Sequence, residues 1–192
     1  MPAHIHLHAW LPHLAVVALA GFFFVSMAWV SITFFVVEDN GAVMGKRAIS
    51  MLAGGGSAYV LWRLLTSVRT DEHWLWIAFG LYAYAIGLFY WAWHANRSRP
   101  LDFAFSGREP QHFNQSGPYR WIRHPFYSAY CVAWVASWLA IREVGVTLLA
   151  LLLISTYAIA ARREERAFCA SGFAEAYQRY RSKTGMFLPR LR

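Results

Sequence analysis

Acidic residues and cysteines are scarce in this chain. Ten Asp and Glu are set against 18 Lys and Arg in 192 residues, so the formal net charge is +8. The two cysteines, Cys131 and Cys169, lie in an apolar run and in a polar tail respectively, and we expect no disulfide between them. Charged residues of both signs make up only 15% of the chain, whereas hydrophobic residues make up 58%. This balance excludes an ordinary soluble core and predicts a protein embedded in a membrane.

Runs of about 20 apolar residues are long enough to cross a bilayer as helices. The sequence contains several such runs, and the last two are shorter and separated only by Arg142-Glu143. The candidate spans extend from Trp10 to Val37, Ala48 to Val68, Trp74 to Trp93, Phe126 to Ile141 and Val144 to Ala161. We therefore predict an all-α integral membrane protein with about five transmembrane helices, the last two forming a C-terminal helical hairpin. In the second span, the glycines at positions 54 to 56 offer a small surface for close helix packing.

The basic residues follow the positive-inside rule, so the net charge does not call for a nucleic-acid partner. If the C-terminus is cytoplasmic, most Lys and Arg fall on the cytoplasmic side, including Lys46, Arg47 and the basic residues from Arg162 to Arg192. Five spans then place the N-terminus outside. The histidines at positions 4, 6, 8 and 13 have no carboxylate or cysteine beside them, so we expect no metal site.

One segment combines charge, aromatic rings and two prolines at the entrance of an apolar run: Gly117-Pro-Tyr-Arg-Trp-Ile-Arg-His-Pro-Phe-Tyr127. Anchoring at the membrane surface accounts for its arginines and for Trp121. Anchoring gives no reason for His124 and Pro125 at the point where the helix begins. A proline in the first helical turn leaves the preceding residues to present side chains and backbone groups to a ligand. From the residues alone, an anchor and a ligand site are equally good interpretations.

A second polar patch, Arg162-Arg-Glu-Glu-Arg166, follows the fifth apolar run. Its arginines could neutralise Glu164 and Glu165 as a solvated cluster. Alternatively, a carboxylate faces a polar ligand held against the Tyr119 to Tyr127 segment, because both segments lie at the same membrane boundary. Beyond the patch, the pattern from Ala167 to Arg181 predicts an amphipathic surface helix, whereas residues 94–116 predict a cytoplasmic loop.

Taken in chain order, these features resemble the isoprenylcysteine carboxyl methyltransferase family of integral membrane enzymes, in its bacterial form. The resemblance rests on the Gly117 to Tyr127 motif, Glu164-Glu165, the Tyr177 and Tyr180 pair and Leu188-Pro189, and it covers about Gln111 to Leu191. Related phospholipid N-methyltransferases and small-thiol methyltransferases share much of the His-Pro-x-Tyr pattern. The resemblance implies S-adenosyl-L-methionine as methyl donor, bound in a cytoplasm-facing pocket, and an acceptor that arrives from the bilayer.

Carried over by position, the resemblance also implies individual site residues. The cofactor-binding residues would be Gln111, His112, Phe113, Asn114, Tyr119, His124, Pro125, Phe126, Tyr127 and Glu165. Eukaryotic members place a substrate-contacting arginine where this chain has Ala161, so Arg162 or Arg163 is the candidate for that role, and His124 is a candidate base. Aromatic faces suit a sulfonium cation, and a carboxylate accepts hydrogen bonds from hydroxyl or ammonium groups.

The sequence thus predicts a membrane methyltransferase acting on a lipophilic or lipid-linked acceptor, with the carboxylate of an isoprenylcysteine-like molecule favoured. A carboxylate is already ionised at neutral pH and needs no general base, whereas a phospholipid amine or a thiol has to lose a proton. An NADPH-dependent sterol-type reductase and a non-enzymatic membrane scaffold are the rival interpretations. We expect residues 1–93 to form a three-helix scaffold, residues 94–192 to form the methyltransferase core, and the protein to reside in a bacterial inner membrane.

Overall fold

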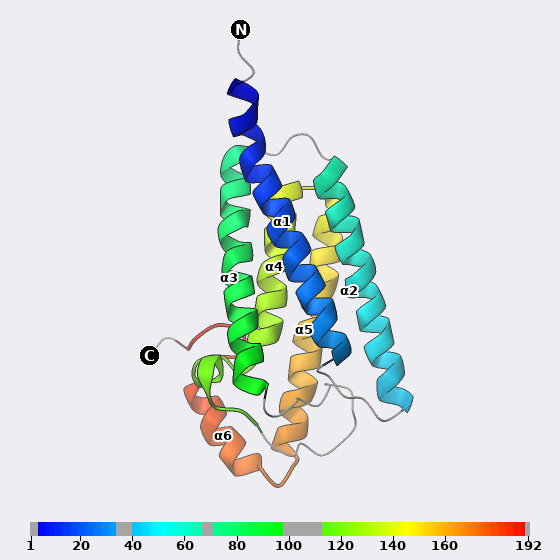
Figure 1. Ribbon diagram of the computed structural model, residues 1–192. Coiled ribbons are helices and arrows are strands. Elements are labelled where there is room, and N and C mark those ends of the chain that lie inside the picture. Colours follow the sequence, from blue (N-terminus) through cyan, green and yellow to red (C-terminus); the bar gives the residue numbers. More distant parts are fainter. Residues whose placement is uncertain (1–3, 34–39, 67–70, 98–112, 191–192) are drawn as a thin grey trace.

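Five long helices form a single bundle, with a short helix packed at one end (Figure 1). The computed structural model describes residues 4–33, 40–66, 71–97 and 113–190, with side chains described from Trp10 in the first range and from Arg47 in the second. The long helices are α1 His4–Thr33, α2 Asn40–Thr66, α3 Glu72–Asn96, α4 Pro125–Ile141 and α5 Val144–Cys169. A 3-10 turn, η1 Gly117–Arg120, and the short helix α6 Ala174–Lys183 lie at the end of the bundle away from the start of α1.

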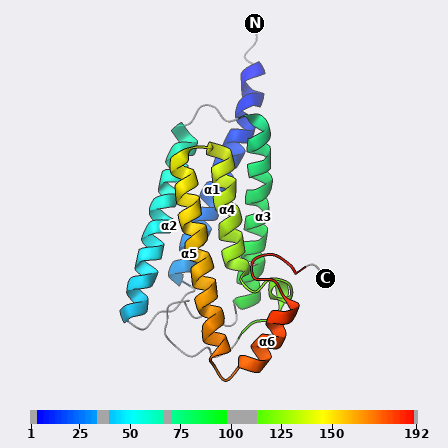
Figure 2. The same ribbon diagram turned by 180° about the vertical axis from the view of Figure 1, so that it is seen from behind.

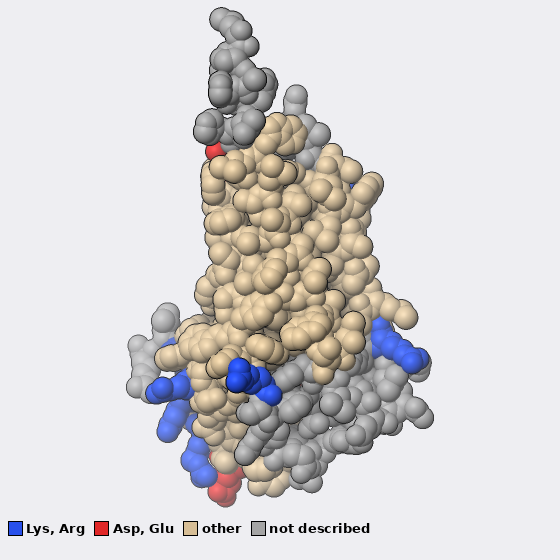
Figure 3. All heavy atoms as spheres, in the orientation of Figure 1, with Lys and Arg blue, Asp and Glu red and all other residues tan. Residues whose placement is uncertain are grey.

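The helices match the hydropathy of the sequence. Four of them contain stretches long and apolar enough to cross a membrane, namely Trp10–Thr33, Arg47–Thr66, Glu72–Asn96 and Val144–Cys169. The fifth, α4, is a shorter apolar helix that runs between α3 and α5 (Figure 2). Lys and Arg side chains gather around the α6 end, below a broad band without charge (Figure 3). The prediction of an all-α integral membrane protein is confirmed.

The pairing of α3 with α4 is the most extensive helix contact among the described residues. The Tyr82 hydroxyl of α3 and the Ser137 Oγ of α4 lie 2.7 Å apart and share a hydrogen bond in the buried interior. Aromatic rings fill the space around it, with Phe89 of α3 5.4 Å from Phe126 and 6.1 Å from Tyr130 between ring centres. A buried hydrogen bond and close ring packing hold the two helices in one register. The α3–α4 pair is therefore the frame on which the start of α4 is positioned.

Ion pairs close the opposite end of the bundle, where α4 turns into α5. Arg142 follows α4 with a left-handed φ of 54°, and its N–H bonds the Trp138 carbonyl. Its guanidinium lies 4.9 Å from the Trp74 ring of α3. Next to it, Glu143 pairs with Arg63 of α2. These contacts tie the hairpin to α2 and α3 at the end remote from α6.

Several helix ends differ from the expected ones. The first helix begins at His4 instead of Trp10, and the second begins at Asn40 instead of Ala48. Residues 94–96 continue α3 instead of starting a loop. The fifth helix runs on past Ala161 to Cys169, because Ala, Arg and Glu are good helix formers and keep the backbone hydrogen-bonded as the chain leaves the apolar zone. The amphipathic helix expected from Ala167 to Arg181 is consequently wrong in its bounds: turns interrupt it around Gly172, and α6 covers only its second part. Of the three glycines at positions 54 to 56 in α2, Gly56 makes the close contact, since a Cβ there would come 3.1 Å from Leu149.

Candidate functional site

The segment between α3 and α4 is bent back onto α3 by a glycine. Gly117 has a φ of +55°, and a Cβ at this position would come 3.0 Å from Ala95 of α3. Glycine carries neither the steric penalty of that φ nor the side chain that would collide. Pro125 then occupies the first position of α4, where its missing N–H costs nothing. The residues before Pro125 are therefore delivered to the end of the bundle in a defined direction.

The C-terminal tail pairs with this segment along its backbone. Gly185 N donates to the Trp121 carbonyl at 3.0 Å, and Arg123 N donates to the Gly185 carbonyl at 2.9 Å. Further along, His124 N donates to the Met186 carbonyl at 3.1 Å. Buried backbone groups need such partners. Chain segments far apart in the sequence are thereby fixed side by side.

A buried ion pair forms where the tail, α5 and the start of α4 meet. Arg123 Nε lies 2.7 Å from Glu165 Oε1, and the two side chains are only 8% and 5% exposed. Arg123 also donates to the Thr184 carbonyl of the tail. The other carboxylate oxygen of Glu165 lies 3.4 Å from Arg181 Nε, at the end of α6. A buried charge pair of this kind is tolerated only when further hydrogen bonds satisfy it, and here they do.

His124 lies between two carboxylates. Its Nδ1 is 3.2 Å from Glu164 Oε2 and its Nε2 is 3.4 Å from Glu165 Oε1. The Tyr127 hydroxyl donates to Glu164 at 2.7 Å, and the Tyr127 ring stacks on the imidazole with centres 5.7 Å apart. We call Arg123, His124, Tyr127, Glu164 and Glu165 the His124 cluster. Its five side chains come from the two residues that precede α4, from the first turn of α4, and from the last turns of α5.

The imidazole of this cluster has a raised pKa and one nitrogen without a hydrogen bond. Burial by itself lowers the pKa of His124, but the neighbouring carboxylates of Glu164 and Glu165 outweigh burial and leave the pKa above its ordinary value. The Nε2 atom is buried, and its approach to Glu165 does not have hydrogen-bond geometry, so among the described residues it has no hydrogen-bond partner. Such an atom is a natural point of attachment for a ligand.

An aromatic cluster covers the opposite side of the tail. The Phe113 ring packs edge-on against Tyr177 at 5.5 Å and lies 5.8 Å from Phe168, which itself stacks on Tyr177 at 4.7 Å. Burial raises the pKa of the Tyr180 phenol well above its ordinary range, so the hydroxyl keeps its proton and donates to the Tyr119 carbonyl at 2.7 Å. This hydrogen bond joins α6 to the segment that leads into the His124 cluster.

A chain of polar side chains anchors the same segment to the end of α3. Asn96 donates to the Tyr119 hydroxyl at 2.8 Å, and Asn114 donates to the Asn96 side chain at 3.0 Å and to the Ala95 carbonyl at 2.8 Å. Asn96 and Tyr119 are buried. Because the Asn96 and Tyr119 side chains hydrogen-bond to each other, both polar groups can be buried here without an unpaired donor or acceptor.

The predicted site residues fall into three groups. His124, Tyr127 and Glu165 come together, and Pro125 begins the helix that carries Tyr127 and follows His124. Phe113, Asn114 and Tyr119 lie in the adjoining aromatic and amide contacts, and Gln111 and His112 lie outside the described residues. The remaining predictions are not brought to the cluster: the Phe126 ring packs in the α3–α4 core, and Arg162 and Arg163 are exposed on α5.

Four contributors to the site were not predicted as site residues. Arg123 was expected only as a membrane anchor, yet it forms a buried ion pair with Glu165, and Glu164 accepts from Tyr127 beside His124. Thr184 accepts from Arg123, and the Phe187 ring lies 6.2 Å from His124. The position of Arg123 directly before the His-Pro pair was the available signal. The tail residues carried none, because their role depends on backbone pairing with a distant segment.

The phospholipid methyltransferase family matches residues 74–176, which is more than half of the chain and includes α3, α4 and all of α5. Comparison with curated proteins and with solved structures returned no match. The matched range contains every side chain of the His124 cluster and the helix pair that positions it. The chain therefore belongs to the phospholipid methyltransferase family and is an integral membrane methyltransferase.

Proposed function

We propose that this protein transfers a methyl group from S-adenosyl-L-methionine to a lipophilic acceptor at the His124 cluster, and that the acceptor group is the carboxylate of an isoprenylcysteine-like molecule. The observation that carries the proposal is the position of His124 between Glu164 and Glu165. Membership of the family supports the methyl donor and a membrane-borne acceptor. The arrangement of charges supports the choice of acceptor group.

The residues present suit the methyl donor. When bound, the donor supplies an electrophilic methyl group on a sulfonium. The buried Nε2 of His124 would bond one of its polar groups, and the stacked ring of Tyr127 would favour the positive charge. Glu164 is 24% exposed, so it can accept from an ammonium or hydroxyl without losing Tyr127. Tyr119 and Asn114, in the adjoining contacts, complete the proposed set.

A carboxylate acceptor fits the surroundings of His124. The carboxylates of Glu164 and Glu165 raise the pKa of His124 and so favour its protonated form, which is not the form that takes a proton from an acceptor. A carboxylate requires no base, because it is ionised already. The protein then has to hold the two reactants in line and exclude water. Arg162 and Arg163, exposed on α5 beside Glu164, are the proposed attractors of the acceptor's charge.

A phospholipid amine is the second candidate, and the family match favours it. An ammonium has to lose a proton before it can accept a methyl group. Within the His124 cluster, Glu164 is the partly exposed carboxylate and would be the group to take that proton. Transfer to an amine would therefore depend on Glu164, whereas transfer to a carboxylate would not need it as a base.

The proposal includes a cytoplasmic position for the His124 cluster. The band of Lys and Arg at the α6 end supports it, because basic residues are concentrated on the cytoplasmic side of membrane proteins (Figure 3). With α1 starting at the other end, the N-terminus would be outside (Figure 1). The same orientation would place the pocket where the methyl donor is made, and a bacterial inner membrane is the proposed location.

The test has a binding arm and a transfer arm. Detergent-purified protein is titrated with S-adenosylhomocysteine and, as a control, with NADPH, and thermal stability is followed; a ligand that binds only the folded protein raises its Tm. We expect stabilisation by S-adenosylhomocysteine alone, and stabilisation by NADPH alone would refute the proposal. Radiolabelled methyl transfer is then compared between an N-acetyl-S-prenylcysteine and a phosphatidylethanolamine. Labelling of the prenylcysteine is the expected result, and labelling of only the amine lipid would establish the second candidate instead.

A further inference from the structure

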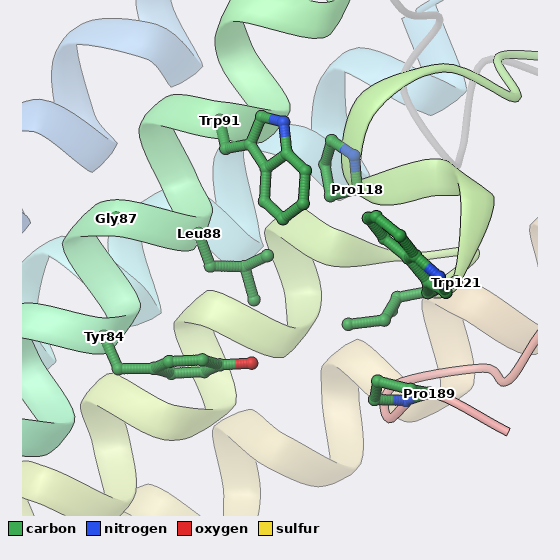
Figure 4. A pocket seen from close by; sticks show the side chains of 8 residues that line it. Tyr84, Gly87, Leu88, Trp91, Pro118, Trp121 and Pro189 are labelled. Atoms are coloured by element: carbon green, nitrogen blue, oxygen red, sulfur yellow. The ribbon is translucent and has the colours of Figure 1, made fainter. Parts of the chain in front are cut away.

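An apolar groove lies outside the His124 cluster, between the exposed face of α3 and the segment that follows it. Its volume is about 570 Å3. Tyr84, Gly87 and Trp91 of α3 form one wall, and Pro118, Trp121 and Pro189 form the other (Figure 4). None of these residues belongs to the cluster or to the expected cofactor set. The groove is therefore separate from the residues to which the proposed function is assigned.

The groove suits a hydrocarbon chain. Its volume falls within the range of small-molecule sites, and its walls are rings and aliphatic groups. The indoles of Trp91 and Trp121 contact each other with ring centres 5.6 Å apart, and the Tyr84 ring bounds the far end (Figure 4). Because α3 is apolar enough to span a membrane and Tyr84 and Trp91 are exposed on it, this face would meet the bilayer. Lipid is thus the apolar material available to fill the groove.

Two arginines lie next to residues of the groove. The Arg120 guanidinium lies 5.8 Å from the centre of the Trp121 ring, and Trp121 is a groove wall. Arg190 directly follows Pro189 and donates to the Ser182 carbonyl at 2.5 Å. Both arginines are exposed. A guanidinium beside an apolar slot matches the phosphate of a lipid whose chain enters that slot.

We propose that this groove binds one acyl chain of an anionic phospholipid, with its phosphate held by Arg120 and Arg190. The bound lipid bridges the η1 segment and the C-terminal tail, since Pro118 comes from one and Pro189 from the other. The tail is the element whose backbone holds Arg123 and His124 in place. Lipid binding therefore stabilises the tail, and with it the His124 cluster.

Two glycines of α3 give a matched test. Gly80 and Gly87 are seven residues apart, so they lie on the same face of the helix, and a Cβ at either meets nothing within 4 Å. Only Gly87 lines the groove. The purified protein is reconstituted with phosphatidylglycerol carrying a photoreactive group in one acyl chain, and labelled peptides are identified by mass spectrometry. We expect labelling of the Trp91 and Trp121 peptides, and a loss of roughly five-fold or more in Gly87→Leu but not in Gly80→Leu.

The proposed contact between Arg120 and the lipid phosphate is tested with a second pair of variants. Arg120→Gln should reduce the preference for phosphatidylglycerol over phosphatidylcholine by about five-fold, the contribution of one basic side chain at a membrane surface. Arg179→Gln, an exposed arginine of α6 outside the groove, should leave the preference unchanged. Labelling that is unaffected by Gly87→Leu, or equal for the two lipids, would show an ordinary bilayer-facing wall and overturn the proposal. Displacement of the label by a prenylcysteine would overturn it too, because the groove would then belong to the acceptor.

Discussion

Replacing Glu165 by Ala should destabilise the protein far more than its single lost carboxylate suggests. Arg123 and Glu165 are 2.7 Å apart and 8% and 5% exposed, so the variant leaves a guanidinium buried without its counter-charge. Breaking a buried pair in this way costs about 3–5 kcal/mol. Domains are stable by only about 5–15 kcal/mol, so the loss is a large part of the total. The same change removes the second carboxylate from beside His124.

The matched control is Glu175→Ala on α6. Glu175 also faces an arginine, Arg179, but the atoms are 3.6 Å apart and the side chains are 89% and 72% exposed. An exposed pair of this kind contributes at most about 1 kcal/mol. Thermal unfolding of both variants in one detergent, with and without S-adenosylhomocysteine, gives stability and binding together. We expect a large fall in Tm and loss of most of the ligand response for Glu165→Ala, and neither for the control.

A double variant separates the cost of the unpaired charge from the worth of the pair. Glu165→Ala combined with Arg123→Met removes both charges, so its instability should be less than the sum of the two single variants. If Glu165→Ala behaves like Glu175→Ala in stability and in ligand response, the ion pair is not buried as described and the cofactor site is misplaced.

Two further changes follow from the same geometry. The pKa of His124 is raised in the folded protein, so the stability that His124 contributes is fully present below the ordinary pKa near 6.5 and is lost as the pH rises through the raised pKa. Tm measured over a pH series should show this fall in the wild type and a flatter curve in His124→Asn. Identical curves for the two proteins would disprove the linkage. Gly185→Ala should displace the C-terminal tail and weaken the response to S-adenosylhomocysteine, because its Cβ would collide with the Leu188 carbonyl oxygen. The control Gly54→Ala places its Cβ in open space and should leave the response unchanged. An unchanged response in Gly185→Ala would show that the tail is not part of the site.

Local sequence patterns predicted the elements but not all of their ends. Hydropathy placed the five long helices correctly, since an apolar run in a membrane has to satisfy its own backbone hydrogen bonds. The start of α4 could be read from Pro125, because proline favours the first helical turn. The end of α5 could not be read in the same way, since Arg and Glu form helices as readily as they mark a membrane boundary.

The candidate site was predictable only in part, for a geometric reason. The motif around His124 and the carboxylates near Glu165 stand out as sequence, and a resemblance can join them into one pocket. The sequence alone does not predict which arginine pairs with Glu165, because Arg123, Arg162 and Arg163 carry the same side chain and all lie near the same end of the bundle. The rotation of α5 and the packing of α4 leave Arg162 and Arg163 exposed and bring Arg123 to the carboxylate.

The sequence by itself determined that this protein is a membrane-embedded helical bundle with a polar end, because hydropathy and helix propensity act over neighbouring residues. Only the tertiary structure decided how that end is built. The tail residues that hold Arg123 and His124 are joined to them by backbone hydrogen bonds from a distant part of the chain. Backbone groups are the same in every residue, so their pairing leaves almost no trace in the sequence and is settled by the way the helices pack.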